Sequence, residues 1–195
     1  ADVLGVSAPA VTRMVQRLKE AGYLEHEPYQ GILLTHSGER AALLSIRRHR
    51  IVERFLTDVM HFGWHEVHDH ADELAATVSD FVLARMEKMA GYPRRCPHGE
   101  PIPTANGIMP QVTDTPLNEA HINNDYTISR VNTHDSAILK YLDTLVLKPG
   151  MSLSLVSRAP FNGPLQIRSH NREHFIGHDL GRVLRVCSAE EYAMV

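Results

Sequence analysis

The chain has 195 residues, a formal net charge of −3, 43% hydrophobic residues and 22% charged residues. This composition excludes a disordered tail, because the chain holds enough apolar side chains to bury a core. No run approaches the roughly 18 consecutive apolar residues that a membrane helix needs, and the N-terminus lacks the basic and then apolar layout of a secretory signal. We therefore expect a soluble, cytoplasmic protein with no membrane partner.

The two cysteines, Cys96 and Cys187, lie far apart and outside any C-x-x-C spacing. Their placement excludes a disulfide framework, an iron–sulfur cluster and a thiolate zinc knuckle. We interpret both as reduced thiols.

The N-terminal part of the sequence predicts a winged helix. Residues 1–5 read as the end of a helix whose start is missing, and Ser7 can cap the next helix, with Pro9 in its first turn and Gly22 at its end. Residues 23–25 and 32–35 flank the turn-forming residues 28–31, which is typical of a two-stranded hairpin. A helix-turn-helix followed by a hairpin is a winged helix.

The second of these helices carries polar side chains that are suited to DNA. Thr, Arg and Gln side chains can bond base edges or phosphates in a major groove. The alternative is an ordinary exposed helix face. The predicted DNA-binding residues are Ser7, Pro9, Thr12, Arg13 and Gln16.

Two long amphipathic helices are predicted next, from residue 37 to about 60 and from about 65 to 90. Six of the 11 prolines fall between residues 93 and 116, which predicts a linker. Short β-prone runs at 126–131, 151–157, 165–169 and 182–187, with one helix at about 136–145, predict a small β-barrel. The expected fold class is mainly α with a small β-barrel. The expected domains are a winged helix at 1–40, a helical domain at 41–105, a linker at 106–125 and a barrel at 126–195.

Two pairs of candidate metal ligands lie on the predicted long helices. His49 and Glu53 are four residues apart, as are His68 and Asp72, so the members of each pair share a helix face. Helices packed face to face would bring His49, Glu53 and His68 onto one cation. Nitrogen and carboxylate ligands favour Mn²⁺, Fe²⁺, Co²⁺, Ni²⁺ or Zn²⁺. The alternative is a set of surface ion pairs.

The order of these features resembles a known family. The residues that carry the resemblance follow the winged helix and lie at 48–56, 67–69 and 78–80 and in the run Cys96-Pro97-His98-Gly99-Glu100-Pro101-Ile102-Pro103. Over nearly the whole chain, this order is similar to the diphtheria toxin repressor family of metal-dependent transcriptional regulators. The resemblance implies a winged helix-turn-helix domain lacking its first segment, a helical dimerisation and metal-binding domain, and a C-terminal FeoA-like β-barrel.

The resemblance also implies an ancillary metal site made by His49, Glu53 and His68. The family completes this site with polar groups of the barrel, for which His134 and Asp135 are the nearest candidates.

At the primary site of the family, this sequence departs from the pattern. Asp72 stands where the family has a cysteine or an acidic residue, but Ala75 and Ala76 replace a glutamate and a histidine. Alanine cannot bind metal, so we expect a remodelled or lost primary site.

The function implied by the resemblance is that of a homodimeric regulator, a repressor of metal-uptake genes that binds palindromic double-stranded operator DNA. Mn²⁺ is the favoured metal and Fe²⁺ the next, with Zn²⁺, Co²⁺ or Cd²⁺ binding in vitro. One alternative is a winged-helix protein with a structural metal or none. Another is a metalloenzyme, which the lack of H-E-x-x-H, G-x-S-x-G and phosphate-loop motifs disfavours, so we expect no enzyme. A third treats the barrel as a module that binds Pro-rich segments.

Overall fold

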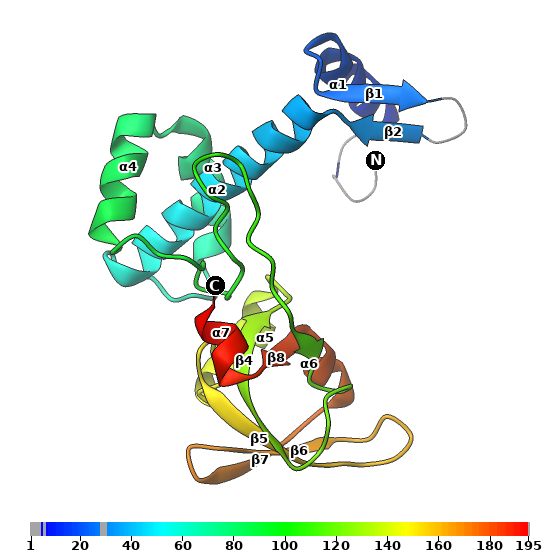
Figure 1. Cartoon of the computed structure of the whole chain (residues 1–195), viewed down its shortest axis with the longest axis vertical. Coiled ribbons are helices and arrows are strands. Elements are labelled where there is room, and N and C mark those ends of the chain that lie inside the picture. The colour runs from blue at the N-terminus through cyan, green and yellow to red at the C-terminus, as the bar shows by residue number, and fades with distance from the viewer. Residues whose placement is uncertain (1–4, 6, 28–30, 195) are drawn as a thin grey trace. The chain divides into compact units, whose positions relative to one another are not determined.

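The computed structural model describes residues 5, 7–27 and 31–194 (Figure 1). Its contacts define two compact units, one made of residues 1–47 and 103–109 and the other of residues 48–102 and 110–195. Among the described residues, none of the helices is long and apolar enough to cross a membrane.

The first unit contains α1 (Ala8–Glu20), the antiparallel hairpin of β1 (Leu24–Glu27) and β2 (Gly31–Leu34), and the start of α2 (His36–Asp58). The helix and hairpin lie where the sequence predicts them, and Gly22 adopts the positive φ of 76° that ends α1. Ser7 occupies the N-cap position as predicted, although its side chain makes no capping hydrogen bond. The predicted turn residues 28–30 and the predicted helix end at residues 1–4 lie outside the described residues.

The second unit begins with a helical layer formed by the rest of α2, α3 (Val67–Thr77) and α4 (Asp80–Met89). The prediction of one helix over residues 65–90 is wrong, because the chain breaks at Val78, whose backbone is extended. Ser79 then caps α4 by accepting a hydrogen bond from the Val82 amide. These helices share a small apolar core, which comprises Ile51, Val52, Leu56, Val67, Ala71, Leu83 and Ile102.

The unit continues as an antiparallel sheet with strand order β3-β8-β4-β5-β6-β7 (Figure 1). The strands are β3 (Thr115–Pro116), β4 (Asn124–Val131), β5 (Ser152–Arg158), β6 (Leu165–Ser169), β7 (Arg172–Ile176) and β8 (Leu184–Cys187). The helices of this part are α5 (Ser136–Thr144), α6 (His178–Val183) and α7 (Ala189–Ala193). Among the described strands β3 and β7 do not pair, so the sheet is open and the prediction of a barrel is corrected to a six-stranded sheet.

Two parts of the sheet domain differ from the sequence prediction. β7 was not expected, because the turn before it is made by His170 and Asn171, both at positive φ, and lacks the glycine that usually marks a tight hairpin. Residues 182 and 183 belong to α6 and not to the last strand. A single core of leucines, isoleucines and valines from the strands and α5 holds the sheet together.

The proline-rich segment from residue 93 is not a simple linker. Cys96 and His98 are buried, and the amide of Ile102 donates to the carbonyl of Arg94 at 2.7 Å, which closes a tight loop. Further along, β3 pairs with β8, and Leu117 is fully buried. Proline prevents regular structure in this segment, but it does not prevent packing. The domain boundaries drawn from the sequence stay a prediction.

Candidate metal centre

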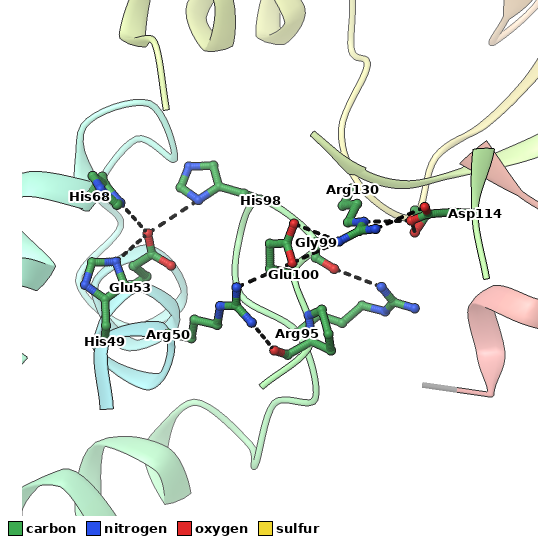
Figure 2. A network of polar contacts seen from close by, with 12 residues as sticks. His49, Arg50, Glu53, His68, Arg95, His98, Gly99, Glu100, Asp114 and Arg130 are labelled. Carbon is green, nitrogen blue, oxygen red and sulfur yellow. Dashed lines mark hydrogen bonds and ion pairs between the residues drawn. The ribbon is translucent and has the colours of Figure 1, made fainter. Parts of the chain in front are cut away.

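Glu53 lies at the centre of the polar cluster in the helical layer (Figure 2). It occupies the face of α2 that turns toward α3, and it is only 1% exposed. One oxygen of its carboxylate, Oε1, has three imidazole nitrogens around it, at 3.1 Å (His49 Nε2), 3.3 Å (His68 Nδ1) and 3.4 Å (His98 Nδ1). The sequence predicted the first two histidines from helical spacing, and the fold adds the third from the proline-rich loop.

His98 is held with one ring nitrogen free. Its Nε2 lies 2.8 Å from the carbonyl oxygen of Trp64, which can only accept, so Nε2 carries the proton. In a neutral ring Nδ1 then presents a lone pair to the Glu53 carboxylate and forms no hydrogen bond. This arrangement is the one in which metal-ligating histidines are usually fixed.

The charges of the cluster fit a cation. Burial raises the pKa of Glu53, but contacts with His49, His68 and His98 lower it by a larger amount. The net pKa therefore lies far below the ordinary value. The pKa of His68 is raised, chiefly by its hydrogen bond to Glu53. Nε2 of His49 is also buried without a hydrogen bond. An ionised carboxylate and two unpartnered imidazole nitrogens thus face one another, and a divalent cation would satisfy all of them.

Cys96 offers a further ligand atom. The ligand atoms of Glu53, Cys96 and His98 lie within 4.8 Å of one another, as do those of His49, Glu53 and His68, so Glu53 is common to both groups. Burial, and next the charge of Glu53, raise the pKa of the Cys96 thiol well above its usual range. The thiol therefore stays protonated unless a cation displaces the proton.

The other predicted ligands make contacts of their own in the structure, and their roles as ligands stay predictions. Asp72 Oδ1 lies 2.9 Å from His49 Nδ1, on the far side of the ring from Glu53, so it orients His49. The ring of His134 stacks on that of His68 at 3.8 Å between centroids. Asp135 instead caps α5, with one carboxylate oxygen accepting from two backbone amides at 2.8 and 3.1 Å.

Sequence reasoning did not assign ligand roles to His98 and Cys96. Both stand in the C-P-H-G run that was noted as a family signature, but the surrounding prolines suggested a linker. The signal that points to them is their residue type, since a thiol and an imidazole are both common metal ligands and stand close together in this run.

Comparison with known proteins identifies the family. Three family models match the chain in order: iron dependent repressor, N-terminal DNA binding domain (residues 1–32), iron dependent repressor, metal binding and dimerisation domain (35–104), and FeoA domain (115–186). A solved manganese-dependent transcriptional repressor in complex with manganese is similar with a TM-score of 0.86 and 32% identity, over 96% of this chain and 88% of that one. The chain belongs to the iron-dependent repressor family.

Other members of the iron-dependent repressor family are also similar to this chain in sequence or in structure. The diphtheria toxin repressor of Corynebacterium glutamicum is 33% identical over 116 residues, which are 60% of this chain and 51% of that protein. The match therefore spans about half the length of this curated relative. The structure of ScaR with bound Cd²⁺ has a TM-score of 0.78 and 28% identity, over 96% of this chain and 88% of that chain. The family is one of transcriptional repressors, not of enzymes.

The positions at which this chain departs from the expected family pattern lie on α3. Ala75 packs against the helical core, and Ala76 is exposed. Neither side chain carries a ligand atom. A remodelled or lost primary site stays a prediction.

The predicted DNA-binding residues extend from the N-cap of α1 to Gln16 in its C-terminal half, and all are exposed. Thr12 Oγ1 donates to the carbonyl of Ala8 at 3.1 Å, and the amide of Gln16 donates to Glu20 at 2.8 Å. Arg13 lies beside Met14 and Arg17 on the same exposed surface of the helix. Ser7 lies at the N-cap of α1 and Pro9 in its first turn.

Proposed function

We propose that this chain is a metal-dependent, DNA-binding transcriptional repressor. The observation that carries the proposal is the buried meeting of one ionised carboxylate with three imidazoles, two of which present unpartnered nitrogens to it. Two of the matching family models are named for iron-dependent repressors, which supports the class of function.

The ion would be held by His49, Glu53, His68 and His98, with Cys96 as a fifth donor. A bound cation supplies a positive charge that joins three segments of the chain: α2, α3 and the loop from residue 94 to 102. Asp72 and the Trp64 carbonyl keep two of the rings in orientation through their outer nitrogens. The free energy available for regulation is the difference in metal affinity between the DNA-competent arrangement and the others.

Mn²⁺ is the metal we favour, with Fe²⁺ next. Carboxylate and imidazole donors suit both ions, and a relative of known structure is described as manganese-dependent. The softer thiol of Cys96 suits Zn²⁺, Co²⁺ and Cd²⁺, which we expect to bind in vitro.

The partners in this proposal are double-stranded operator DNA and a second copy of the chain, in the cytoplasm. Exposed residues of α1 would meet the major groove. The segment matched by the dimerisation model carries large exposed apolar side chains, namely Leu74, Phe81, Val82, Met89 and Tyr92. Such a patch is typical of a subunit interface.

The test is fluorescence anisotropy of the protein on DNA from upstream of its own gene, titrated with Mn²⁺, Fe²⁺ and Zn²⁺ and reversed with chelator. We expect affinity to rise with metal and to fall on chelation. Glu53→Gln keeps the size of the side chain and removes its charge, so it should abolish the metal response. Glu173→Gln is the matched control, because Glu173 pairs with Arg168 on the surface of the sheet.

Equal DNA binding with and without metal would overturn the proposal. It would favour the alternative of a winged-helix protein whose ion is structural or absent.

A further inference from the structure

The loop that carries Cys96 and His98 is fastened to the C-terminal sheet by its backbone. The amide of Val131 on β4 donates to the carbonyl of His98 at 2.8 Å. Gly99 lies so close to the same strand that a Cβ added to it would be 2.2 Å from the carbonyl oxygen of Ser129. The position of the His98 main chain is therefore set by β4, although its ring belongs to the metal centre.

Glu100, two residues after His98, joins this loop to both α2 and the sheet (Figure 2). Nη1 of Arg130, on β4, lies 3.1 and 3.2 Å from the two carboxylate oxygens of Glu100. On the other side, Nη2 of Arg50 lies 3.4 Å from Glu100, and Nη1 of Arg50 donates to the carbonyl of Pro101 at 2.6 Å. Arg50 stands one residue after His49, so the same stretch of α2 carries a candidate ligand and the partner of the loop.

Asp114 holds the far end of this network. Its side chain is 1% exposed and receives a two-pronged contact from Arg130, at 2.7 Å from Nε and 3.1 Å from Nη2. Ser129 donates to it at 2.8 Å, and Arg185 on β8 pairs with its other oxygen and donates to its carbonyl at 2.8 Å. Asp114 thus fixes the plane of the Arg130 guanidinium, and this guanidinium in turn forms an ion pair with Glu100.

The network contains three guanidinium groups and two carboxylates, and each carboxylate pairs with two of the guanidinium groups. Removing one partner of such a set leaves a charge without compensation, so the rest must rearrange. The part that can move is the loop, because β4 and β8 are paired strands and α2 is a long helix. Loss of the charge of Asp114 or Glu100 is therefore expected to shift the loop and, with it, the positions of His98 and Cys96.

We propose that Glu100 and Asp114, linked through Arg130, are positioning residues of the metal centre, through which the C-terminal sheet sets the distance of His98 and Cys96 from Glu53. The inference rests on the proposed metal-binding function. Neither carboxylate binds the ion in this proposal. Each acts through the loop.

The test uses the full chain with Asp114→Asn and Glu100→Gln, which keep the size of the side chains and remove their charge. Calorimetric titration with Mn²⁺ is done at a temperature at which circular dichroism shows each variant folded. We expect the affinity to fall by roughly 10- to 100-fold, the usual effect of removing a group that orients a ligand. Glu173→Gln is the control, because it breaks an exposed ion pair of the same sheet, and its affinity should equal that of the parent.

Two further measurements separate positioning from mere stability. Co²⁺ bound through Cys96 gives a thiolate charge-transfer band, which should weaken or shift in both variants. In the protein without metal, amide hydrogen exchange over residues 94–102 should become faster, whereas that of α4 should not change. A variant that only lowers the melting temperature would leave the Co²⁺ spectrum as it is.

The outcomes distinguish the two proposals. If Glu53→Gln binds Mn²⁺ as well as the parent does, the metal centre itself is wrong. If Glu53→Gln loses binding while both network variants keep the parental affinity and Co²⁺ spectrum, the centre stands and the positioning inference is overturned. If Asp114→Asn does not fold, Glu100→Gln decides, since Glu100 is partly exposed and its replacement is the milder change.

Discussion

Replacement of Gly99 by alanine tests how closely the ligand loop must approach the sheet. Gly99 has a φ of 89°, in the region that favours glycine. A Cβ at this position would lie 2.2 Å from the Ser129 oxygen and 2.7 Å from the Arg130 Cα, and both of these are backbone atoms that cannot rotate away. Gly99→Ala must therefore push the loop off β4.

The size of the effect follows from two contributions. The left-handed backbone costs an alanine about 1–2 kcal/mol, and forcing an extra carbon into a packed site typically costs about 1–3 kcal/mol. We expect the free energy of unfolding to fall by about 2–5 kcal/mol, a large part of the stability of an ordinary domain. Because the carbonyl of His98 would lose its contact with Val131, affinity for Mn²⁺ should fall as well.

Gly91→Ala is the matched control. Gly91 has a φ of 77°, and a Cβ there would meet nothing within 4 Å. Both substitutions remove the same conformational freedom from the unfolded chain, so the difference between them isolates the contact with β4. Urea denaturation of the metal-free variants measures the stabilities, and calorimetry measures Mn²⁺ binding. If Gly99→Ala is no more destabilising than Gly91→Ala, the argument for close packing of the loop is refuted.

Three other predictions concern stability and DNA binding. Burial raises the pKa of Asp114, but the guanidinium of Arg130 and the other donors lower it by more, so the net pKa lies below the ordinary 3.8. The ionised carboxylate therefore contributes fully to stability above pH 3.8, and this contribution is lost as the pH falls through the lowered pKa. Urea denaturation should show Asp114→Asn less stable than the parent at pH 7, with a difference in unfolding free energy that narrows below about pH 4; a difference that stays constant would contradict this. Arg48 donates to the carbonyls of Ala75 and Val78 and pairs with Asp80. Arg48→Met should therefore lower the free energy of unfolding by about 1–3 kcal/mol. An unchanged urea midpoint would show that these contacts do not hold the break between α3 and α4. Arg13→Met should weaken DNA binding, with a shallower salt dependence if it meets a phosphate, and unchanged affinity and salt slope would rule out the proposed DNA-reading face of α1.

Local patterns carried much of the fold and part of the site. The spacing of His49 and Glu53 depends only on the pitch of one helix, so it predicted that both side chains share a face. Proline at the start of α1 and glycine after its end act within a few residues, and the helix appears where they place it. The strands with alternating or continuous apolar residues were also found, because each is a local run.

Features set by contacts distant in sequence were missed. At the break between α3 and α4, the carbonyl of Val78 accepts a hydrogen bond from Arg48 on α2, a contact that no local pattern indicates. β7 forms because β6 offers it a partner, and its own residues alternate too weakly to predict a strand. One carboxylate oxygen of Asp135 accepts from the amides at the start of α5, and its role as a metal ligand stays a prediction.

The sequence by itself determined the family and indicated the candidate ligands His49, Glu53 and His68. A helix places residues four apart on one face, and a signature run can be read directly. Only the tertiary structure decided that His98 and Cys96 join Glu53, that Asp72 stands behind His49, and that an open sheet holds the loop in place. The physical reason is that a buried charge needs partners from all directions. One helix face supplies only some of them, and the rest come from segments that meet only when the chain folds.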